Sequence, residues 1–480
     1  MPTDTVTNRG PTSITSDDRY ELVVVGGGAG GLVAAREGRR RGARVVMVQD
    51  GPVGGDCTFT GCVPSKALLA AAARGDGFDV AMSGVRRAVA EIAATEDAAT
   101  LVGEGIDVVE GYGRFTSPST VEVETADGPR RVVAGRFVVA TGARPAVPPI
   151  PGLREARPLT NETLFDIARR PDSMIVLGGG PIGCEMAQAF ARMGTRITLV
   201  EAVDRILPRE EPEASAAITA ALTDDGVDVR TGDAVASVER LDGGRVQVRT
   251  AAGATVIADD VLVAVGRTPS GRGLGLEEIG VEVDDRGAVV VDATTATAVD
   301  GIFAVGDVTG GLQFTHVAGR MGWVAASNAL SRVARVRRFR FDPAPVPWAT
   351  FTSPEVGRVG LTETEAAERH PDARVAHLPL THVDRAVAVG ATRGFVRLIA
   401  APKRGVRHLG GGRLVGATVV APTGGDIVHE AALAMQTNMF VGRLAQTSHA
   451  YPSWAGAIQQ AALQFFGPSA GLEARPVQRP

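Results

Sequence analysis

Two of the three cysteines, Cys57 and Cys62, lie in one glycine-rich run. Two neighbouring thiols in a chain with so few cysteines are typical of a redox-active or metal-binding dithiol. Five residues of α-helix rise about 7.5 Å, which is beyond the reach of a disulfide bond. The two sulfurs can therefore meet only in a distorted helix start, for which Gly54, Gly55 and Gly61 supply the backbone freedom.

Lysine is almost absent from the chain. Lys66 and Lys403 are its only lysines, and Lys66 follows shortly after Cys62. A helix N-terminus and a nearby ammonium both favour the thiolate, which is the reactive form of cysteine. We therefore expect a reactive dithiol here, whereas Cys184, which lies far from the pair in the sequence, is predicted to be a packed apolar residue.

The elements that must position this dithiol begin with a βαβ unit near the N-terminus. The hydrophobic pattern predicts a strand over 20–25, a helix through Arg41 and a second strand over 43–48. The first turn reads G-x-G-x-x-G, with its glycines at Gly26, Gly28 and Gly31. The N–H groups of such a turn face a pyrophosphate, so the unit predicts a dinucleotide site.

The same pattern returns further along the chain. A strand over 173–177, a helix to about 193 and a strand over 196–200 frame a second turn, with glycines at Gly178, Gly180 and Gly183. Because each copy has its own strand and helix, the pair predicts two dinucleotide sites.

The residue that ends the second strand of each unit faces a ribose. In the first unit that residue is Gln49, which can still hydrogen-bond to hydroxyl groups. In the second unit it is Glu201, whose carboxylate repels a 2′-phosphate and therefore favours NADH over NADPH. Arg205 follows closely enough to weaken this preference.

Composition places the chain among globular proteins. The 480 residues exceed one ordinary core, the net charge is −4, and the first eighteen residues are polar. No apolar run is long enough to span a membrane, and the charge gives no reason to expect a nucleic-acid partner. These features predict a cytoplasmic protein.

Four further motifs complete the pattern: Ala-Thr-Gly-Ala-Arg-Pro at 140–145, Val-Gly-Arg-Thr-Pro at 265–269, Gly-Ile-Phe-Ala-Val-Gly-Asp at 301–307 and Phe-Thr-Ser-Pro-Glu-Val at 351–356. With the cysteine run, they make the chain resemble the pyridine nucleotide–disulfide oxidoreductases over about residues 20–466. The resemblance implies an α/β fold with two Rossmann-like domains, which bind FAD and NAD(P)H, and a C-terminal α+β dimerisation domain that builds a homodimer.

The resemblance also implies domain boundaries and ligand residues. A disordered tail would cover 1–19, the FAD domain 20–150 and 270–342, the NAD(P) domain 151–269, the dimerisation domain 343–467 and a loose tail 468–480. The implied cofactor residues are Gly26, Gly28, Gly31, Gln49, Thr141, Gly142 and Asp307 for FAD, and Gly178, Gly180, Gly183, Glu201 and Gly266 for NAD(P)H.

The resemblance assigns roles to the reactive side chains. Cys62 would be the thiol beside the flavin, and Cys57 would be the outer thiol that meets the substrate. Lys66 would pair with Glu185 near the flavin. Electrons would pass from the nicotinamide through FAD to the dithiol.

One part of the family pattern is missing. Most disulfide reductases of this family place a His-Pro pair and a following glutamate near the C-terminus, where the histidine moves protons in the partner's site. Here Tyr451 replaces that histidine and Gly456 replaces the glutamate. A tyrosine with a pKa near 10 is a poor proton shuttle at neutral pH. His449 is the alternative proton carrier, although its place two residues upstream favours a surface or interface role.

Mercuric reductases, within the same family, also carry a tyrosine at this place. Reduction of Hg(II) needs soft thiolate ligands, which Cys57 and Cys62 would supply, and no proton for a leaving thiol. We therefore expect Hg(II) reduction, with Tyr451 lining the pocket. Neither the segment before Tyr20 nor the one after Phe466 holds the cysteines that often deliver mercury. The alternatives are a quinone or small-acceptor reductase, a dihydrolipoamide dehydrogenase-like disulfide reductase, and a non-catalytic redox sensor.

Overall fold

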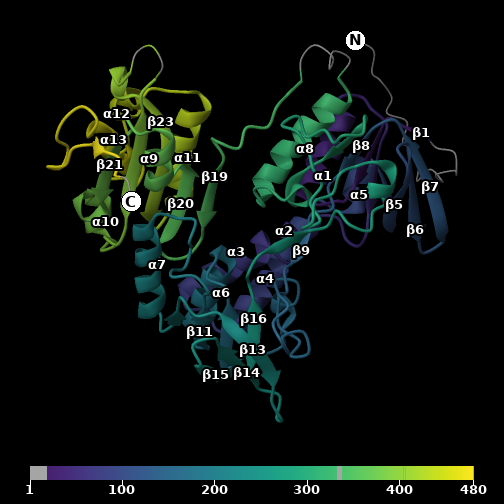
Figure 1. Cartoon of the computed structure of the whole chain (residues 1–480), viewed down its shortest axis with the longest axis horizontal. Helices are drawn as coiled ribbons and strands as arrows, with labels where there is room; N and C mark the ends of the chain where they lie inside the picture. The colour runs from purple at the N-terminus through teal and green to yellow at the C-terminus, as the bar shows by residue number, and fades with distance from the viewer. Residues whose placement is uncertain (1–18, 332–337, 404, 406, 479–480) are drawn as a thin grey trace. The chain divides into compact units, whose positions relative to one another are not determined.

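The computed structural model describes residues 19–331, 338–403, 405 and 407–478 (Figure 1). The predicted disordered tail, apart from Arg19, lies outside the described residues. The chain divides into two compact units. The first contains 1–57, 92–144 and 268–341, and the second contains 58–91, 145–267 and 342–480. The described helices include none that is long and apolar enough to cross a membrane.

The core of the first unit is a five-stranded parallel sheet. Its strands, in spatial order, are β18 (Ile302–Ala304), β8 (Phe137–Val139), β2 (Leu22–Val25), β3 (Val45–Gln49) and β4 (Asp107–Glu110). Every residue of β2 is buried, as expected for a central strand with both faces covered. The single strand predicted over 20–25 is divided into β1 (Arg19–Tyr20) and β2.

Helices α1 (Ala29–Arg40) and α8 (Thr315–Ala329) pack against each other in the first unit. Gly30 and Gly322 permit this close approach, because a Cβ atom on Gly322 would lie 2.2 Å from the carbonyl oxygen of Gly30. The unit also contains α5 (Ala98–Gly103) and the short 3-10 helices η2 (Glu277–Ile279) and η3 (Gly306–Thr309).

A second sheet of the first unit has four strands. It pairs β5 (Tyr112–Ser117), β6 (Thr120–Thr125) and β7 (Gly128–Ala134) as antiparallel neighbours and adds β1 alongside β7. The chain passes between the units near β9 (Ala143–Pro145) and β17 (Arg267–Pro269).

The part of the second unit over 145–267 repeats the Rossmann pattern. Its parallel sheet has the order β12 (Asp228–Arg230), β11 (Arg196–Val200), β10 (Ser173–Leu177) and β16 (Asp260–Val263). The helices that accompany this sheet are α3 (Cys62–Arg74), α4 (Phe78–Ala93), η1 (Leu164–Asp166), α6 (Pro181–Arg192) and α7 (Pro212–Asp224). Helix α4 extends two residues past the boundary of the unit. A small antiparallel sheet follows, with β13 (Val235–Arg240), β14 (Val246–Thr250) and β15 (Thr255–Ala258).

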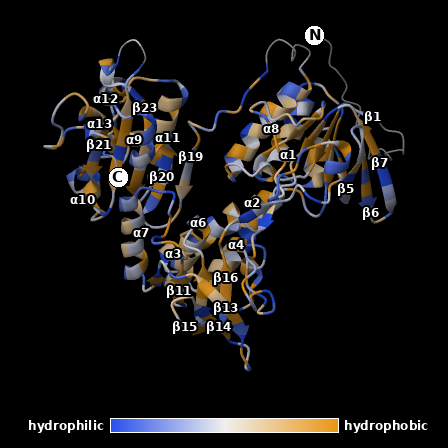
Figure 2. Ribbon diagram, in the orientation of Figure 1, coloured by the Kyte–Doolittle hydropathy of each residue, from blue (hydrophilic) through white to orange (hydrophobic). Residues whose placement is uncertain are grey.

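The C-terminal part of the second unit is built on a six-stranded antiparallel sheet. Its order is β19 (Pro347–Thr350), β20 (Glu355–Gly360), β23 (Arg413–Ala421), β22 (Phe395–Ala401), β21 (Arg374–Pro379) and β24 (Arg475–Pro476). Figure 2 shows that hydrophobic residues dominate the central strands. The helices are α9 (Glu363–Arg369), α10 (Asp384–Ala388), α11 (Gly424–Gln436), α12 (Val441–Gln446) and α13 (Gly456–Leu463), and the 3-10 helices are η4 (Leu380–His382) and η5 (Leu409–Gly411).

The prediction of a loose tail over 468–480 is wrong for the described residues. Arg475 pairs with Val375 in the sheet as part of β24, and its guanidinium forms an ion pair with Glu363. Ala474 is buried. The segment 468–480 contains three prolines and one glycine, but a strand edge and a buried carboxylate hold Arg475 in place. The other domain boundaries stay predictions.

Candidate active site

The cysteine run is divided between two helices. Helix α2 (Gly55–Phe59) ends before α3 begins at Cys62, and Gly54 and Gly55 have φ angles of 121° and 65°. Cys57 is partly buried and Cys62 is exposed at the first residue of α3. The helix break therefore replaces the single distorted helix start expected from the sequence.

The run begins against the first glycine-rich turn. The N–H of Gly54 donates to the carbonyl oxygen of Gly27 at 2.9 Å. A Cβ atom on Gly55 would lie only 2.8 Å from the Cα atom of Gly28. Two backbones meet at this place without intervening side chains. The glycines before Cys57 thus connect the thiol segment directly to the predicted pyrophosphate turn.

Lys66 and Glu185 come together as the family resemblance implied. The Lys66 Nζ atom lies 2.8 Å from Glu185 Oε2, and Glu185 is 3% exposed. The second carboxylate oxygen of Glu185 accepts the N–H of Phe351 at 2.9 Å, and the Lys66 ammonium lies 4.5 Å from the centre of the Phe351 ring. These contacts fix the lysine head within one turn of the helix that starts at Cys62.

The first glycine-rich turn has the geometry of a dinucleotide site. Gly26 has a φ angle of 106°, and a Cβ atom on Gly31 would lie 1.9 Å from the carbonyl oxygen of Gly26. Gly28 precedes α1 without a side-chain cap, so the first N–H groups of the helix remain available to an anion. Gln49 accepts the N–H of Gly27 through its Oε1 atom. The turn therefore fits a pyrophosphate, whereas the Gln49 amide is already engaged by Gly27 and by the carbonyl oxygens of Asp50 and Pro52.

The other predicted FAD residues belong to the same unit. The Thr141 hydroxyl donates to the carbonyl oxygen of Ser270 at 2.9 Å, and Ser270 donates its N–H to Gly142. Gly142 has a φ angle of 70°. Asp307 lies in η3, directly after β18, and is partly exposed. Asp307 thus follows the carboxyl end of a parallel strand, where ligands of such sheets bind.

The second turn repeats this geometry in the second unit. Gly178 has a φ angle of 105°, and a Cβ atom on Gly183 would lie 1.9 Å from the Gly178 carbonyl oxygen. No heavy atom beyond the neighbouring residues lies within 4 Å of a Cβ atom built on Gly180, which leaves room for a phosphate. Glu201 accepts the N–H of Gly179 at 2.6 Å, the position that Gln49 has in the first turn. Gly266, with a φ angle of 134°, follows β16.

Cys184 is a core residue, as predicted. Its side chain is fully buried in α6, and its thiol donates to the carbonyl oxygen of Gly179. Burial raises the pKa of the Cys184 thiol far above its usual range, and the carboxylates of Glu185 and Glu201 add to the shift. This thiol therefore remains protonated and takes no part in thiolate chemistry.

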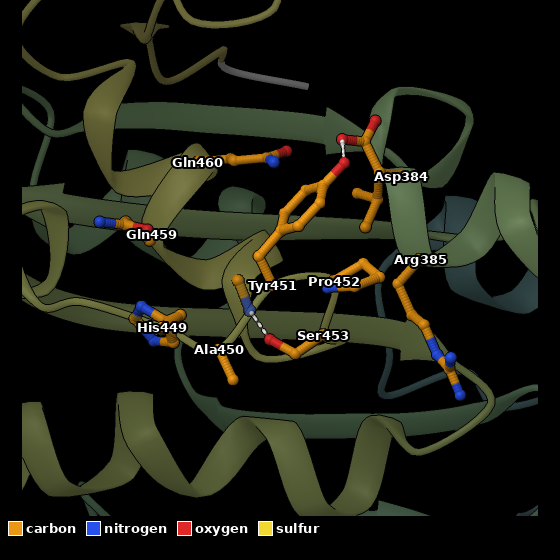
Figure 3. A pocket seen from close by; sticks show the side chains of 11 residues that line it. Asp384, Arg385, His449, Ala450, Tyr451, Pro452, Ser453, Gln459 and Gln460 are labelled. Atoms are coloured by element: carbon orange, nitrogen blue, oxygen red, sulfur yellow. Dashed lines mark hydrogen bonds between the residues drawn. The ribbon is translucent and has the colours of Figure 1, made fainter.

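Tyr451 lies in a pocket lined by residues 383–385 and 449–453 with Gly456, Gln459 and Gln460 (Figure 3). The side chain is 80% exposed, and its hydroxyl donates to Asp384 Oδ2 at 2.8 Å. This hydrogen bond and the negative charge of Asp384 raise the pKa of Tyr451 above its usual value. The phenol is thus held in its protonated form and is less able to act as a proton shuttle than an ordinary tyrosine.

His449 is held on both sides. Its Nε2 atom lies 3.0 Å from Glu430 Oε2, and its Nδ1 atom lies 3.0 Å from the carbonyl oxygen of Thr447. The His449 side chain is 10% exposed. Proton transfer to a substrate would require one of these contacts to break. The geometry therefore favours the structural role that we expected for this histidine.

The effect of Asp384 on Tyr451 can be measured by ultraviolet titration of the phenols, because the chain has only three tyrosines. The pKa of Tyr451 is expected to lie above 10 in the native protein and to fall in the Asp384→Asn variant, which removes the charge while keeping the shape. Tyr451→Phe assigns the transition. An unchanged transition in Asp384→Asn would show that the carboxylate does not control the phenol.

The family model described as pyridine nucleotide-disulphide oxidoreductase matches residues 20–322, and the model of the dimerisation domain of the same family matches residues 346–462. This chain belongs to the pyridine nucleotide-disulphide oxidoreductase family. Members are FAD-dependent and use a pyridine nucleotide, and the dimerisation domain indicates a homodimer typical of the family.

Relatives within the family carry different names. A mercuric reductase of Streptomyces lividans is 36% identical over 93% of this chain and 96% of its own length. A dihydrolipoyl dehydrogenase of Thermus scotoductus is 34% identical over 92% of this chain and 96% of its own length. Among solved structures, the Cu(II) complex of the HOCl-induced flavoprotein disulfide reductase RclA of Escherichia coli matches with a TM-score of 0.85, at 29% identity, over 93% of this chain and 99% of that one.

Three residues of the site were not foreseen from the sequence. Asp384 and Glu430 lie far along the chain from the residues that they hold, Tyr451 and His449. Phe351 contributes through its backbone N–H and its ring, and the quoted motif at 351–356 was the only sequence signal that pointed to it. A carboxylate on a helix gives no local signal of a distant tyrosine partner.

Proposed function

We propose that this protein reduces Hg(II) to Hg(0) with two electrons from NAD(P)H, using Cys57 and Cys62 as the ligands of the ion. Hg(II) and NADH become Hg(0), NAD⁺ and one proton, so that the reaction delivers no proton to the acceptor. Tyr451 supports this proposal most directly, because a phenol held protonated by Asp384 stands where disulfide reductases need an acid–base group.

In this proposal, separate sets of residues would hold the two cofactors. The first glycine-rich turn, with Gln49, Thr141, Gly142 and Asp307, would hold FAD, which supplies two-electron chemistry when it is bound. The second turn, with Glu201 and Gly266, would hold the nicotinamide nucleotide. Lys66, held by Glu185, would supply the positive charge that members of the family place beside the flavin.

The metal ion itself would bind to sulfur. Thiolates are soft ligands and prefer soft ions such as Hg(II) over hard ones. Cys62 is exposed at the start of α3, where the helix N-terminus favours its thiolate. Tyr451 would line the pocket from the other subunit of a homodimer and exclude water from the bound ion.

Cu(II) is the second candidate for the acceptor, and one NADH would reduce two Cu(II) ions to Cu(I). RclA, which is similar in fold and sequence, was solved as a Cu(II) complex. Thiolates favour Cu(I), so the same pair would hold the product of Cu(II) reduction. The dihydrolipoyl dehydrogenase relative supports disulfide reduction instead, but the replacement of the acid–base histidine by Tyr451 argues against that reaction.

The test compares acceptors on one preparation. FAD-loaded protein is mixed with NADH and one acceptor at a time: Hg(II) in excess small thiol, Cu(II) without added thiol, lipoamide, or a quinone. The proposal predicts turnover with Hg(II) that exceeds turnover with the disulfide and the quinone. Inhibition by Hg(II) together with rapid quinone turnover would contradict it and favour a quinone reductase.

A further inference from the structure

After the second glycine-rich turn, α6 and β11, a loop over 201–211 connects β11 to α7. We propose that this loop selects NADH over NADPH, because Arg205 is hydrogen-bonded within the loop and is therefore not a ligand of a 2′-phosphate. We also propose that Arg358 and Trp348 of the C-terminal sheet act as positioning residues for the loop. The inference rests on the proposed NAD(P)H site and adds the choice of nucleotide and its cause.

Glu201 presents its carboxylate at the end of β11. Its Oε2 atom accepts the N–H of Gly179 at 2.6 Å, and its Oε1 atom accepts the N–H of Val203 at 3.1 Å. A carboxylate has about four acceptor positions, so two remain for the hydroxyls of a ribose. The same charge would repel a phosphate at the ribose 2′ position.

Arg205 is turned back on its own loop. Its Nη1 atom donates to the carbonyl oxygen of Glu210 at 3.0 Å, and its Nη2 atom donates to the carbonyl oxygen of Pro208 at 2.7 Å. Both terminal nitrogens of the guanidinium are thus engaged by backbone oxygens. To bind a 2′-phosphate, the side chain would have to give up the contacts that close the loop. The weakening of the NADH preference that the sequence suggested is therefore not expected.

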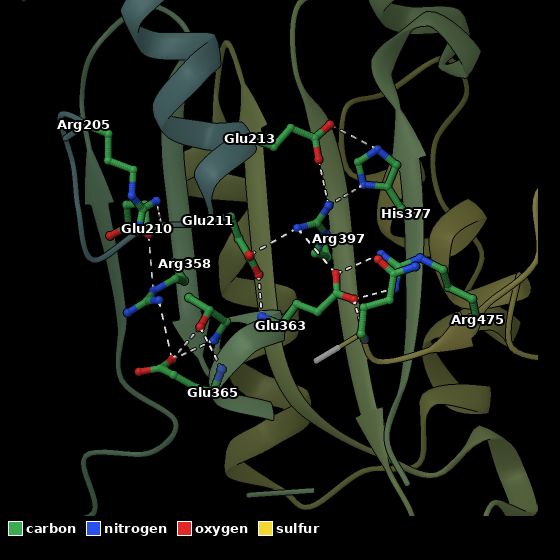
Figure 4. Close-up of polar contacts among 12 residues, drawn as sticks. Arg205, Glu210, Glu211, Glu213, Arg358, Glu363, Glu365, His377, Arg397 and Arg475 are labelled. Carbon is green, nitrogen blue, oxygen red and sulfur yellow. Dashed lines mark hydrogen bonds and ion pairs between the residues drawn. The ribbon is translucent and has the colours of Figure 1, made fainter. Parts of the chain in front are cut away.

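The far end of the loop is anchored in the C-terminal sheet (Figure 4). The Trp348 Nε1 atom donates to Glu210 Oε1 at 2.8 Å, and Arg358 Nε lies 3.3 Å from Glu210 Oε2. The Arg358 guanidinium also lies 4.3 Å from the centre of the Trp348 ring. The Glu210 side chain is 6% exposed, so its charge is compensated inside the protein and not by water.

Glu211, the next residue, is anchored in the C-terminal part in the same way. Arg397 Nη1 lies 3.2 Å from Glu211 Oε2, while Glu211 Oε1 accepts the N–H of Glu363 at 2.8 Å. Glu211 is 1% exposed. Because Glu210 and Glu211 are consecutive and both are buried, the carbonyl oxygen of Glu210 that receives Arg205 has little freedom to move. The C-terminal sheet thereby fixes the position of the loop and of the carbonyl oxygen that accepts from Arg205.

Other arginines near the loop provide comparisons. Arg230 ends β12 beside Glu201 and pairs with Asp228 at 2.8 Å. Arg209 is exposed. Arg393 pairs with Asp224 at 2.5 Å, also between the C-terminal part and α7, but the two side chains are 46% and 63% exposed. Because exposed pairs contribute little, Arg393→Met is a matched control for the buried anchor.

The experiment measures reduction of the bound flavin by NADH and by NADPH under anaerobic conditions, which needs no acceptor. Rapid mixing gives a dissociation constant and a reduction rate for each nucleotide. We expect wild type to bind NADH at least about tenfold more tightly than NADPH, equivalent to about 1.4 kcal/mol. Arg205→Ala should weaken both nucleotides by the same factor and leave their ratio within about twofold. Glu201→Ser should shift the ratio toward NADPH by about tenfold.

The anchor is tested by the mild variant Trp348→Phe, which removes one hydrogen bond, and by Arg358→Met. Both should weaken binding of both nucleotides about threefold or more with little change in reduction rate, whereas Arg393→Met should match wild type. A loss confined to NADPH in Arg205→Ala, or in Arg209→Ala or Arg230→Ala, would overturn the inference. Equal behaviour of Trp348→Phe and Arg393→Met would overturn the role of the anchor.

The outcome also separates this inference from the proposed function. If neither nucleotide reduces the flavin, the proposed function fails together with the inference. If both nucleotides reduce it equally well in wild type, only the inference fails. Failure with Hg(II) as acceptor leaves the flavin reduction, and thus the test of nucleotide choice, unaffected.

Discussion

Replacement of both Cys57 and Cys62 by alanine is expected to lower Hg(II)-dependent oxidation of NADH by about 10³-fold or more. The thiolates are the proposed ligands of the ion, and loss of both removes every soft ligand at the start of α3 that the cysteine run supplies. Reduction of the flavin by NADH should persist, because the second glycine-rich turn and Glu201 are unchanged. Steady-state turnover with Hg(II), measured beside anaerobic flavin reduction, separates the two steps.

Cys184→Ala is the matched control for the double variant. It makes the same chemical change in a thiol that is fully buried in α6 and held protonated. Turnover with Hg(II) should therefore remain close to that of wild type. If the double variant retained turnover within about tenfold of wild type, the dithiol would not be the path of the electrons to the metal ion.

Arg358→Met is expected to lower the free energy of unfolding by about 3–5 kcal/mol, because it leaves a buried carboxylate without its cation. Glu210 and Arg358 each have side chains that are 6% exposed. Methionine fills most of the volume of the arginine stem, so the loss reflects the charge and not a cavity. Urea denaturation followed by tryptophan fluorescence measures the effect, and Arg393→Met, which breaks an exposed pair, should cost less than about 1 kcal/mol.

The double variant Glu210→Leu, Arg358→Met completes this test. Replacement of a buried ion pair by apolar residues is often neutral, so the double variant should regain most of the stability that Arg358→Met loses. Trp348 loses its acceptor in the double variant, because leucine replaces Glu210, and this loss limits the recovery. A double variant as unstable as Arg358→Met would show that the methionine disturbs packing and that the charge is not the cause.

The stability loss should also depend on pH. Burial raises the pKa of Glu210, and Arg358 partly opposes this shift. A carboxyl whose pKa is raised by folding binds its proton more tightly in the folded state, so its stabilisation is present below the ordinary carboxyl pKa of about 4.3 and is lost as the pH rises through the folded-state pKa. Without Arg358 the pKa of Glu210 rises further. The deficit of Arg358→Met should therefore be smaller at about pH 5 than at about pH 8.

The fold could be predicted largely from local patterns. The strands before and after each glycine-rich turn, and the turns themselves, follow from residues that are close in the sequence, such as Gly26 and Gly31 or Gly178 and Gly183. The single strand predicted over 20–25 is divided, because β1 pairs with β7 in a second sheet while β2 lies in the parallel sheet.

Long-range pairs could not be read from the sequence. Three contacts each join residues more than sixty positions apart. They are the ion pair of Arg475 with Glu363, the hydrogen bond of Tyr451 to Asp384 and the hydrogen bond of Trp348 to Glu210. A charged residue has the same local signature whether it is solvated or buried in an ion pair. Lys66 and Glu185 were paired only through the family resemblance, which carries such distant information.

The most direct test of the proposed activity is the amount of mercury vapour released for each NADH consumed. FAD-loaded protein would turn over NADH with Hg(II) and excess small thiol in a sealed vessel, and Hg(0) in the gas phase would be measured beside the loss of NADH absorbance. The account predicts about one Hg(0) per NADH, because both are two-electron couples. Consumption of NADH without release of Hg(0), or inhibition by Hg(II), would contradict it.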